Sequence, residues 1–333
     1  MFLERSCRMI FLDVVILIVG FIALVKGADW FVDGSAALAK NFRVPGLIIG
    51  LTIVALGTSA PELAVSTTAA IQGSNEIALS NVVGSNIFNL LCVLGFCSVI
   101  HPVPVDKIVL KRDFPISIVA AVFVLAMAGF TAIRTNGFAD IRMDANAGMI
   151  SRMTGLILFV CFMIYIGYLV YNARKNPEPE EEGENTPIWK CALLIVIGLA
   201  LIVGGGQAVV YSAKEIARAA GMTETLIGLT IVAVGTSLPE LVTSITAAKK
   251  GETGLAVGNA IGSNIFNMMF ILGISTLIHP IGVNWASVFD LGILIVVSVV
   301  TILFSISKLR ISRREGIIMI ALYVADVIFA IVR

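Results

Sequence analysis

Charged residues are scarce in this chain of 333 residues. Asp, Glu, Lys and Arg make up only 14% of it, whereas about a quarter is usual for a soluble globular domain. Hydrophobic residues make up 58%, and the mean hydropathy is +0.99. This composition excludes a soluble globular protein and indicates an integral membrane protein.

Histidine and cysteine are also few, at two and five residues. The cysteines show neither metal-binding nor disulfide spacing, and four of them lie in or beside apolar segments, where Cys usually acts as a small buried hydrophobe. The net charge of +1 gives no reason to expect an acidic partner. We therefore predict no cofactor, no nucleic acid and no protein partner, and the lipid bilayer as the surroundings of the chain.

Ten apolar segments are long enough to be membrane spans, since a helix needs about 20 residues to cross the hydrocarbon. Arg5 and Arg8 precede the first segment, as in a signal peptide, but no Ala-x-Ala-like cleavage site follows, so we interpret it as a spanning helix. The ten predicted helices are Ile10–Ala39, Gly46–Ile71, Ile77–Ile100, Phe114–Phe130, Thr154–Tyr171, Ile188–Ala219, Glu224–Ala248, Leu255–Ile278, Val288–Ser305 and Gly316–Val332.

The two halves of the chain repeat each other. Gly50–Leu63 returns as Gly228–Leu241, and Gly84–Asn89 returns as Gly262–Asn267, both at the same offset (240 − 62 and 267 − 89 equal 178). Because five helices is an odd number, the second repeat starts on the opposite side of the membrane. We therefore predict an all-α integral membrane protein of ten transmembrane helices in two inverted five-helix repeats, residues 9–172 and 188–333, joined by an acidic linker, 173–187.

The distribution of Lys and Arg predicts the orientation. More of them lie on the side of the linker than on the side of the two termini, and the richer side normally faces the cytoplasm. We therefore expect a multi-pass protein of the cell membrane, plasma or inner, with a cytoplasmic linker and both termini outside.

The second predicted helix is interrupted by polar and helix-breaking residues. Pro61 removes a backbone donor, and Gly57 weakens the helix before it, so the carbonyls around Ala55–Ser59 should lose their partners. Such backbone is tolerated at membrane depth only where it is buried in protein or lines a wet cavity. Oxygen-bearing side chains surround the break in both repeats: Thr58, Ser59 and Glu62, then Thr236, Ser237 and Glu240.

The third helix carries a second polar stripe. Asn81, Ser85 and Asn89 are spaced four residues apart and so share one helix face. Their counterparts in the second repeat are Asn259, Ser263 and Asn267. The combined set is all oxygen, which suits hard cations such as Ca²⁺ or Na⁺. Two carboxylates carry a charge of −2, which one Ca²⁺ or two Na⁺ would neutralise, and this is a physical basis for exchange.

Several polar residues have structural interpretations. The repeated glycines let membrane helices approach closely, so packing is as good an account of them as ion binding. We expect Asn86 and Asn264 to form interhelical hydrogen bonds, and Asn81 and Asn259 to be either ligands or local hydrogen-bonding groups. The carboxylates are different, because a buried charge is costly without a partner and no basic residue lies in these segments.

Two further groups lie near the expected membrane boundary. Lys26, Asp29 and Asp33 of the first helix are expected to form an ion pair there rather than a transport site. His101 and His279 each precede a proline, end their helices and are expected in interfacial turns, with a pH-sensing role as the alternative.

Gly57–Glu62 and Gly84–Asn89, with their second copies, resemble the alpha-repeats of the sodium/calcium exchangers, a family of the cation/calcium antiporter superfamily. The resemblance implies a central site built from the second, third, seventh and eighth helices. It implies Glu62 and Glu240 as central calcium ligands, Thr58 and Thr236 as carbonyl donors to the same site, Ser59, Ser85, Ser237 and Ser263 at flanking sodium sites, and Asn89 and Asn267 lining the centre. The short linker is similar to that of compact prokaryotic forms.

One position departs from some relatives, which carry Asp where this chain has Asn267, and this puts sodium stoichiometry and potassium involvement in question. Proton-coupled relatives typically carry a Gly-Asn-Ala-rich motif before the glutamate, so the Gly-Thr-Ser of this chain favours sodium.

We therefore predict a secondary antiporter, not an enzyme, that exchanges Na⁺ for Ca²⁺ by alternating access, with sodium entry driving calcium out. A proton/calcium antiporter with the same glutamates is the first alternative, and a cation channel is the second. Ile10–Ala39 and Ile188–Ala219 each run to about 30 residues and lack the ligand set, so we expect this pair to slide across the other helices.

Overall fold

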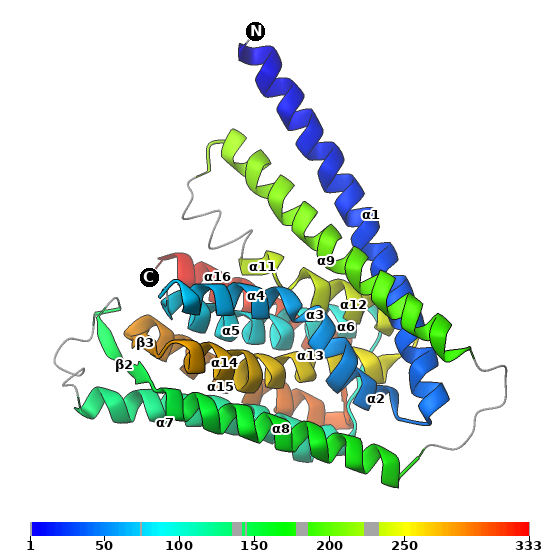
Figure 1. The fold of residues 1–333 in the computed structure, drawn as a ribbon, viewed down its shortest axis with the longest axis vertical. Helices are drawn as coiled ribbons and strands as arrows, with labels where there is room; N and C mark the ends of the chain where they lie inside the picture. Colours follow the sequence, from blue (N-terminus) through cyan, green and yellow to red (C-terminus); the bar gives the residue numbers. More distant parts are fainter. Residues whose placement is uncertain are drawn as a thin grey trace.

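The structure is a computed structural model that describes residues 2–73, 75–134, 142–143, 145–177, 186–222 and 233–332. Long helices dominate it (Figure 1). In the first repeat they are α1 (Phe2–Phe42), α2 (Gly46–Ile49), α3 (Ala55–Thr58), α4 (Ala60–Ile71), α5 (Asn75–Phe88), α6 (Leu94–Ile100), α7 (Phe114–Arg134) and α8 (Arg152–Lys175). In the second they are α9 (Ile188–Ala219), α11 (Ala233–Gly235), α12 (Leu238–Lys249), α13 (Thr253–Ile265), α14 (Leu272–Ile278), α15 (Trp285–Lys308) and α16 (Arg313–Val332).

The described helices confirm a helical membrane protein. Eight of them are long and apolar enough to span a membrane, and a bent pair, Gly46–Thr58 with Ala60–Ile71, makes up to nine within the described ranges. The first nine residues of the seventh predicted helix, Glu224–Ala248, lie outside the described residues (224–232). Most of the predicted linker, from residue 178 to 185, also lies outside them, and α8 continues to Lys175, beyond its predicted end at Tyr171.

Backbone-to-backbone packing joins α1 to α9. A Cβ added at Gly27 would lie 2.7 Å from the carbonyl oxygen of Gly198, and one added at Gly205 would lie 2.7 Å from that of Gly20. Gly20, earlier on α1, thus contacts the later residue on α9, and Gly27 contacts the earlier one. The two helices therefore run antiparallel, as Figure 1 also shows. Because α1 and α9 occupy matching places in the repeats, this is the arrangement that inversion requires.

Four short strands, which the sequence did not predict, cross-link the repeats at their ends. The segment after the third helix of each repeat pairs antiparallel with the segment before the fifth helix of the other repeat. Strand β1 (Val103–Pro104) pairs with β4 (Arg310–Ile311), and β2 (Asn146–Ile150) pairs with β3 (Ile281–Asn284). Strands this short carry no alternation of apolar and polar residues that could be recognised in the sequence. His101 and His279 follow the last residues of α6 and α14, as predicted, but their backbone is extended.

The core is formed by the helices that follow the polar motifs. Across α5 and α13, with the turns that continue them, most residues are buried, whereas α1, α7, α8, α15 and α16 each present a row of exposed large apolar side chains. The exposed rows fit a lipid-facing surface, since lipid is as apolar as these side chains. In the described structure, the polar motifs therefore lie at the centre of the protein, on its most buried helices.

Candidate functional site

Both repeats break a helix immediately before a glutamate. In the first, α3 ends at Thr58, Ser59 adopts φ −81° and ψ 11°, and the chain bends by 50° into α4. In the second, Ser237 adopts φ −93° and ψ 7° before α12. A proline in the first turn of each new helix explains why it restarts there. Each glutamate then lies in the first turn, where the helix dipole favours negative charge.

Each glutamate accepts a hydrogen bond from the break of the other repeat. Ser59 donates to Glu240 Oε1 at 2.8 Å, and Ser237 donates to Glu62 Oε1 at 2.9 Å. Ser85 of α5 also reaches Glu62 Oε1, at 3.4 Å. Residues predicted from separate motifs are thus brought into one cluster by the pseudo-twofold relation of the repeats.

The cluster is buried and carries two carboxylates without an ion pair to any described residue. The side chains of Glu62 and Glu240 are fully buried. The other predicted ligands are buried too, except the half-buried Thr236: Thr58, Ser59, Ser85, Asn89, Ser237, Ser263 and Asn267. Two uncompensated charges in such surroundings are costly, so bound cations or protons must balance them.

The cluster also leaves oxygens without hydrogen-bond partners. Among the described residues, the buried unpartnered side-chain atoms include Glu62 Oε2, Glu240 Oε2, Asn89 Oδ1, Asn267 Oδ1, Ser263 Oγ and Thr236 Oγ1. A buried acceptor without a partner costs about 1–3 kcal/mol, and more when charged. All six atoms are oxygens, the ligand type of Ca²⁺ and Na⁺. The chemistry of the set therefore fits a hard cation.

The expectation for the broken backbone was partly wrong. Ala55 O accepts from Ser59 N at 3.0 Å, and Ser59 O accepts from Leu63 N at 3.1 Å, so both ends of the predicted range are bonded. The helix resumes after one residue. Pro61 lacks the N–H that would usually bond Gly57 O, but this carbonyl still accepts from a backbone N–H at the cap of α3.

Asn81 and Asn259 hold the broken helices to their neighbours. Asn81 Nδ2 donates to Ser66 Oγ at 2.9 Å and to Glu62 O at 3.3 Å, and Asn259 Nδ2 makes the same bonds, 2.9 and 3.3 Å long, to Ser244 and Glu240. The amide nitrogens of both therefore act as local hydrogen-bonding groups. Neither serine was predicted as part of the site, although the two obey the 178-residue offset (244 − 66).

The helices widen at the two central asparagines. Asn89 opens a π-helical turn, Asn89–Val93, and Asn267 lies in another, Phe266–Ile271. Turns of this kind occur mostly inside α-helices and often at functional sites. No residue pattern predicted them. Gly262 has a packing role, because a Cβ there would lie 2.7 Å from Leu51 Cα.

A cavity of about 280 Å³ lies between α9 and the two helix breaks. Pro61, Gly206, Gln207, Thr236 and Pro239 contribute to its lining. It reaches Thr236, one of the predicted ligands, and its wall is formed by α9 on one side and by both broken helices on the other. It is therefore a candidate route to the buried cluster from one side of the protein.

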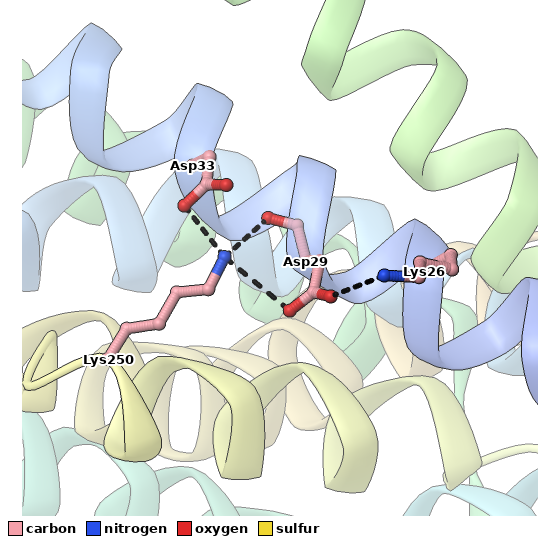
Figure 2. Close-up of polar contacts among 4 residues, drawn as sticks. All are labelled: Lys26, Asp29, Asp33 and Lys250. Atoms are coloured by element: carbon pink, nitrogen blue, oxygen red, sulfur yellow. Dashed lines mark hydrogen bonds and ion pairs between the residues drawn. The ribbon is translucent and has the colours of Figure 1, made fainter.

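Ion pairs link α1 to the residue that follows α12, as Figure 2 shows. Lys250 Nζ lies 2.7 Å from Asp33 Oδ1 and 3.5 Å from Asp29 Oδ1, and it also donates to Asp29 O at 3.0 Å. Lys26 Nζ pairs with Asp29 at 3.8 Å, so the predicted ion pair within the first helix is confirmed. The bridge to the second repeat was not predicted, because nothing in the sequence brings residue 250 beside α1.

The fold and the buried oxygen cluster around Glu62 and Glu240 are those of a membrane transporter for cations. The sodium/calcium exchanger protein family matches residues 12–171 and 190–332, that is, both repeats. The putative antiporter CaxA of Alkalimonas amylolytica is 38% identical over 323 residues, covering 93% of this chain and 96% of CaxA. The sodium/calcium exchanger MaX1 of Methanosarcina acetivorans is 34% identical over 342 residues, covering 95% of this chain and 98% of MaX1.

A solved structure agrees. The sodium-calcium exchanger NCX_Mj, soaked with Na⁺ and Sr²⁺, superposes with a TM-score of 0.80 at 33% identity, over 96% of this chain and 98% of that one. The chain therefore belongs to the sodium/calcium exchanger family. It is a multi-pass membrane protein and an antiporter of Ca²⁺ against another cation, not an enzyme, and its ions are transported substrates rather than cofactors.

Proposed function

We propose that this antiporter couples Na⁺ entry to Ca²⁺ export by alternating access. The observation that carries the proposal is the pair of fully buried carboxylates, Glu62 and Glu240, set among oxygens and bonded across the repeats by Ser237 and Ser59. One Ca²⁺ or two Na⁺ balances the same charge of −2, so occupancy by one ion species excludes the other. The name of MaX1, a sodium/calcium exchanger, supports sodium as the coupling ion.

The proposed ligand roles follow the chemistry of each group. Glu62 and Glu240 bind Ca²⁺ between the repeats, with backbone carbonyls contributed at Thr58 and Thr236. The serines at the margins bind Na⁺, and Asn89 and Asn267 line the centre. The unpartnered oxygens of the glutamates and asparagines support this assignment, because a bound cation satisfies each of them.

The proposed moving element is the pair α1 and α9. Their glycine-mediated contact supports movement as one unit, and they contribute none of the proposed ligands. Sliding of this pair across the remaining helices would expose the site on one side at a time. The cavity between α9 and the helix breaks is the proposed open route in the arrangement described here. The proposed orientation in the cell membrane places the linker in the cytoplasm and both termini outside.

Competition binding tests the coupling ion directly. Binding of ⁴⁵Ca²⁺ to the purified protein should be displaced by Na⁺ but not by choline at equal ionic strength. Displacement should be steeper than for one competing ion, because two Na⁺ replace one Ca²⁺. If Na⁺ failed to displace Ca²⁺ while acidification did so, the site would exchange protons, and the sodium proposal would be wrong.

A further inference from the structure

Four buried asparagines form a closed set of hydrogen bonds across the pseudo-twofold axis. Asn86 Nδ2 donates to the backbone oxygen of Asn264, and Asn264 Nδ2 donates to that of Asn86, both at 3.2 Å. Asn267 Nδ2 donates to Asn86 Oδ1 at 3.2 Å, and Asn89 Nδ2 donates to Asn264 Oδ1 at 3.1 Å. All four side chains are fully buried.

The backbone carbonyls fix the direction of this set. A carbonyl oxygen can only accept, so Asn86 must turn its amide nitrogen toward Asn264. The amide is planar, and its oxygen then faces Asn267. That oxygen also only accepts, so Asn267 must present its own nitrogen there. The remaining atom of the Asn267 amide, Oδ1, therefore points away from Asn86.

The outcome is the same in both repeats. Asn267 Oδ1 and Asn89 Oδ1 are buried and have no hydrogen-bond partner among the described residues. A side-chain amide has two ends of opposite polarity: its oxygen attracts a cation, and its NH₂ group repels one. Among the described residues, the hydrogen bonds that Asn267 and Asn89 donate to the other two asparagines decide which end of each amide remains available.

We propose that Asn86 and Asn264 are positioning residues that hold the amides of Asn267 and Asn89 with oxygen toward the transported ions. The inference rests on the proposed function, because it takes Asn89 and Asn267 to line the ion site. Without Asn86, the amide of Asn267 rotates and turns N–H groups toward the cations or toward the carboxylates. Either orientation competes with ion binding. Asn86 thus acts on the ions through Asn267, without touching them.

A double-mutant cycle separates orientation from packing. The measured quantity is the apparent dissociation constant for Ca²⁺, a concentration obtained from the rise in thermal unfolding temperature with added Ca²⁺. Asn86→Ala is expected to raise this concentration by about tenfold or more, the effect of losing one correctly oriented ligand. The two oxygens of a carboxylate are equivalent, so Asn267→Asp has no orientation to fix. In that background a carboxylate oxygen faces Asn86 Oδ1 in place of the amide nitrogen, so Asn86→Ala is expected to leave the concentration unchanged or lower it, and not to raise it.

Ser298→Ala is the control for loss of a buried hydrogen bond. The Ser298 hydroxyl bonds only within its own helix, to Leu294 O at 2.7 Å, so its loss should lower stability without moving the Ca²⁺ response. Equal fold-changes from Asn86→Ala in both backgrounds would show a packing role and overturn the proposal. If Asn86→Ala does not fold, Asn264→Ala with Asn89→Asp gives the mirror cycle. The Ca²⁺ response of the unmodified protein is measured without a sodium gradient, so a failure of sodium coupling leaves this test intact.

Discussion

The hydroxyl of Ser237 lies 2.9 Å from Glu62 Oε1, although the two residues are 175 positions apart in the chain. Its mirror, Ser59 with Glu240 at 2.8 Å, spans 181 positions. Each carboxylate is therefore oriented by the opposite repeat, and neither repeat can form its half of the cluster alone. The candidate ion site is a property of the paired repeats.

Neutralising either carboxylate tests the proposed ligands. Glu62→Gln and Glu240→Gln keep the size of the side chain but halve the formal charge of the cluster. We expect each variant to lose calcium transport, by about 100-fold or more, with an unfolding temperature in the absence of ions that is unchanged or higher, since an uncompensated buried charge is removed. Flux of ⁴⁵Ca²⁺ and thermal unfolding measure the two effects. Near-normal flux in either variant would show that its carboxylate is not a calcium ligand.

Because α1 packs closely on α9, the effect of a Gly→Ala substitution on stability should depend strongly on its position. At Gly198 an added Cβ would lie 2.6 Å from Phe31 N and 2.8 Å from Gly27 O, both backbone atoms of α1. Gly198→Ala should therefore push the helices apart and lower stability by about 1–3 kcal/mol. Gly204→Ala, on the same helix, is the matched control, because no described atom lies within 4 Å of its added Cβ.

In the control variant, stability should stay equal or rise by up to about 1 kcal/mol, the helix-propensity difference between Ala and Gly. Unfolding temperatures of the two variants measure the contrast. If Gly198→Ala were as stable as Gly204→Ala, α1 and α9 would not be held by direct backbone contact, and they would not move as one unit.

The bridge from Lys250 to Asp29 and Asp33 joins the proposed moving element to α12. The mirror positions are Gln72, Gln207 and Tyr211, which cannot form such a bridge between α4 and α9. If α1 and α9 slide as proposed, the bridge stabilises the arrangement described here, and the mirror arrangement lacks a counterpart to it. Removing it should shift the balance by about 1 kcal/mol, or about fivefold in population.

Lys250→Gln is expected to add a longer component to the distance distribution between spin labels on α1 and α12. Lys26→Gln is the matched control, because it removes the same charge beside Asp29 but breaks only a pair within α1. Identical distributions for the two variants would mean that the bridge does not hold α1 in place.

Most of what could be predicted from the sequence came from the repetition of its two halves. The offset of 178 residues located Glu62 with Glu240 and Asn89 with Asn267, and apolar length located the first and sixth helices, the latter to the residue. The orientation of side chains was not predictable, because it depends on contacts between residues such as Asn86 and Asn264 that only the folded pair creates. The short strands and the π-helical turns have no periodic signal, and the Lys250 bridge depends on how α1 crosses α12.

Ion-driven uptake into proteoliposomes tests the central claim, which is the coupling of calcium to sodium. Vesicles loaded with Na⁺ and diluted into Na⁺-free medium containing ⁴⁵Ca²⁺ should accumulate calcium, and a sodium ionophore should abolish the accumulation. Vesicles with an outward proton gradient of equal size, but no sodium, should take up no calcium above protein-free vesicles. Uptake driven by the proton gradient alone, or uptake that persists without any gradient, would contradict sodium/calcium exchange.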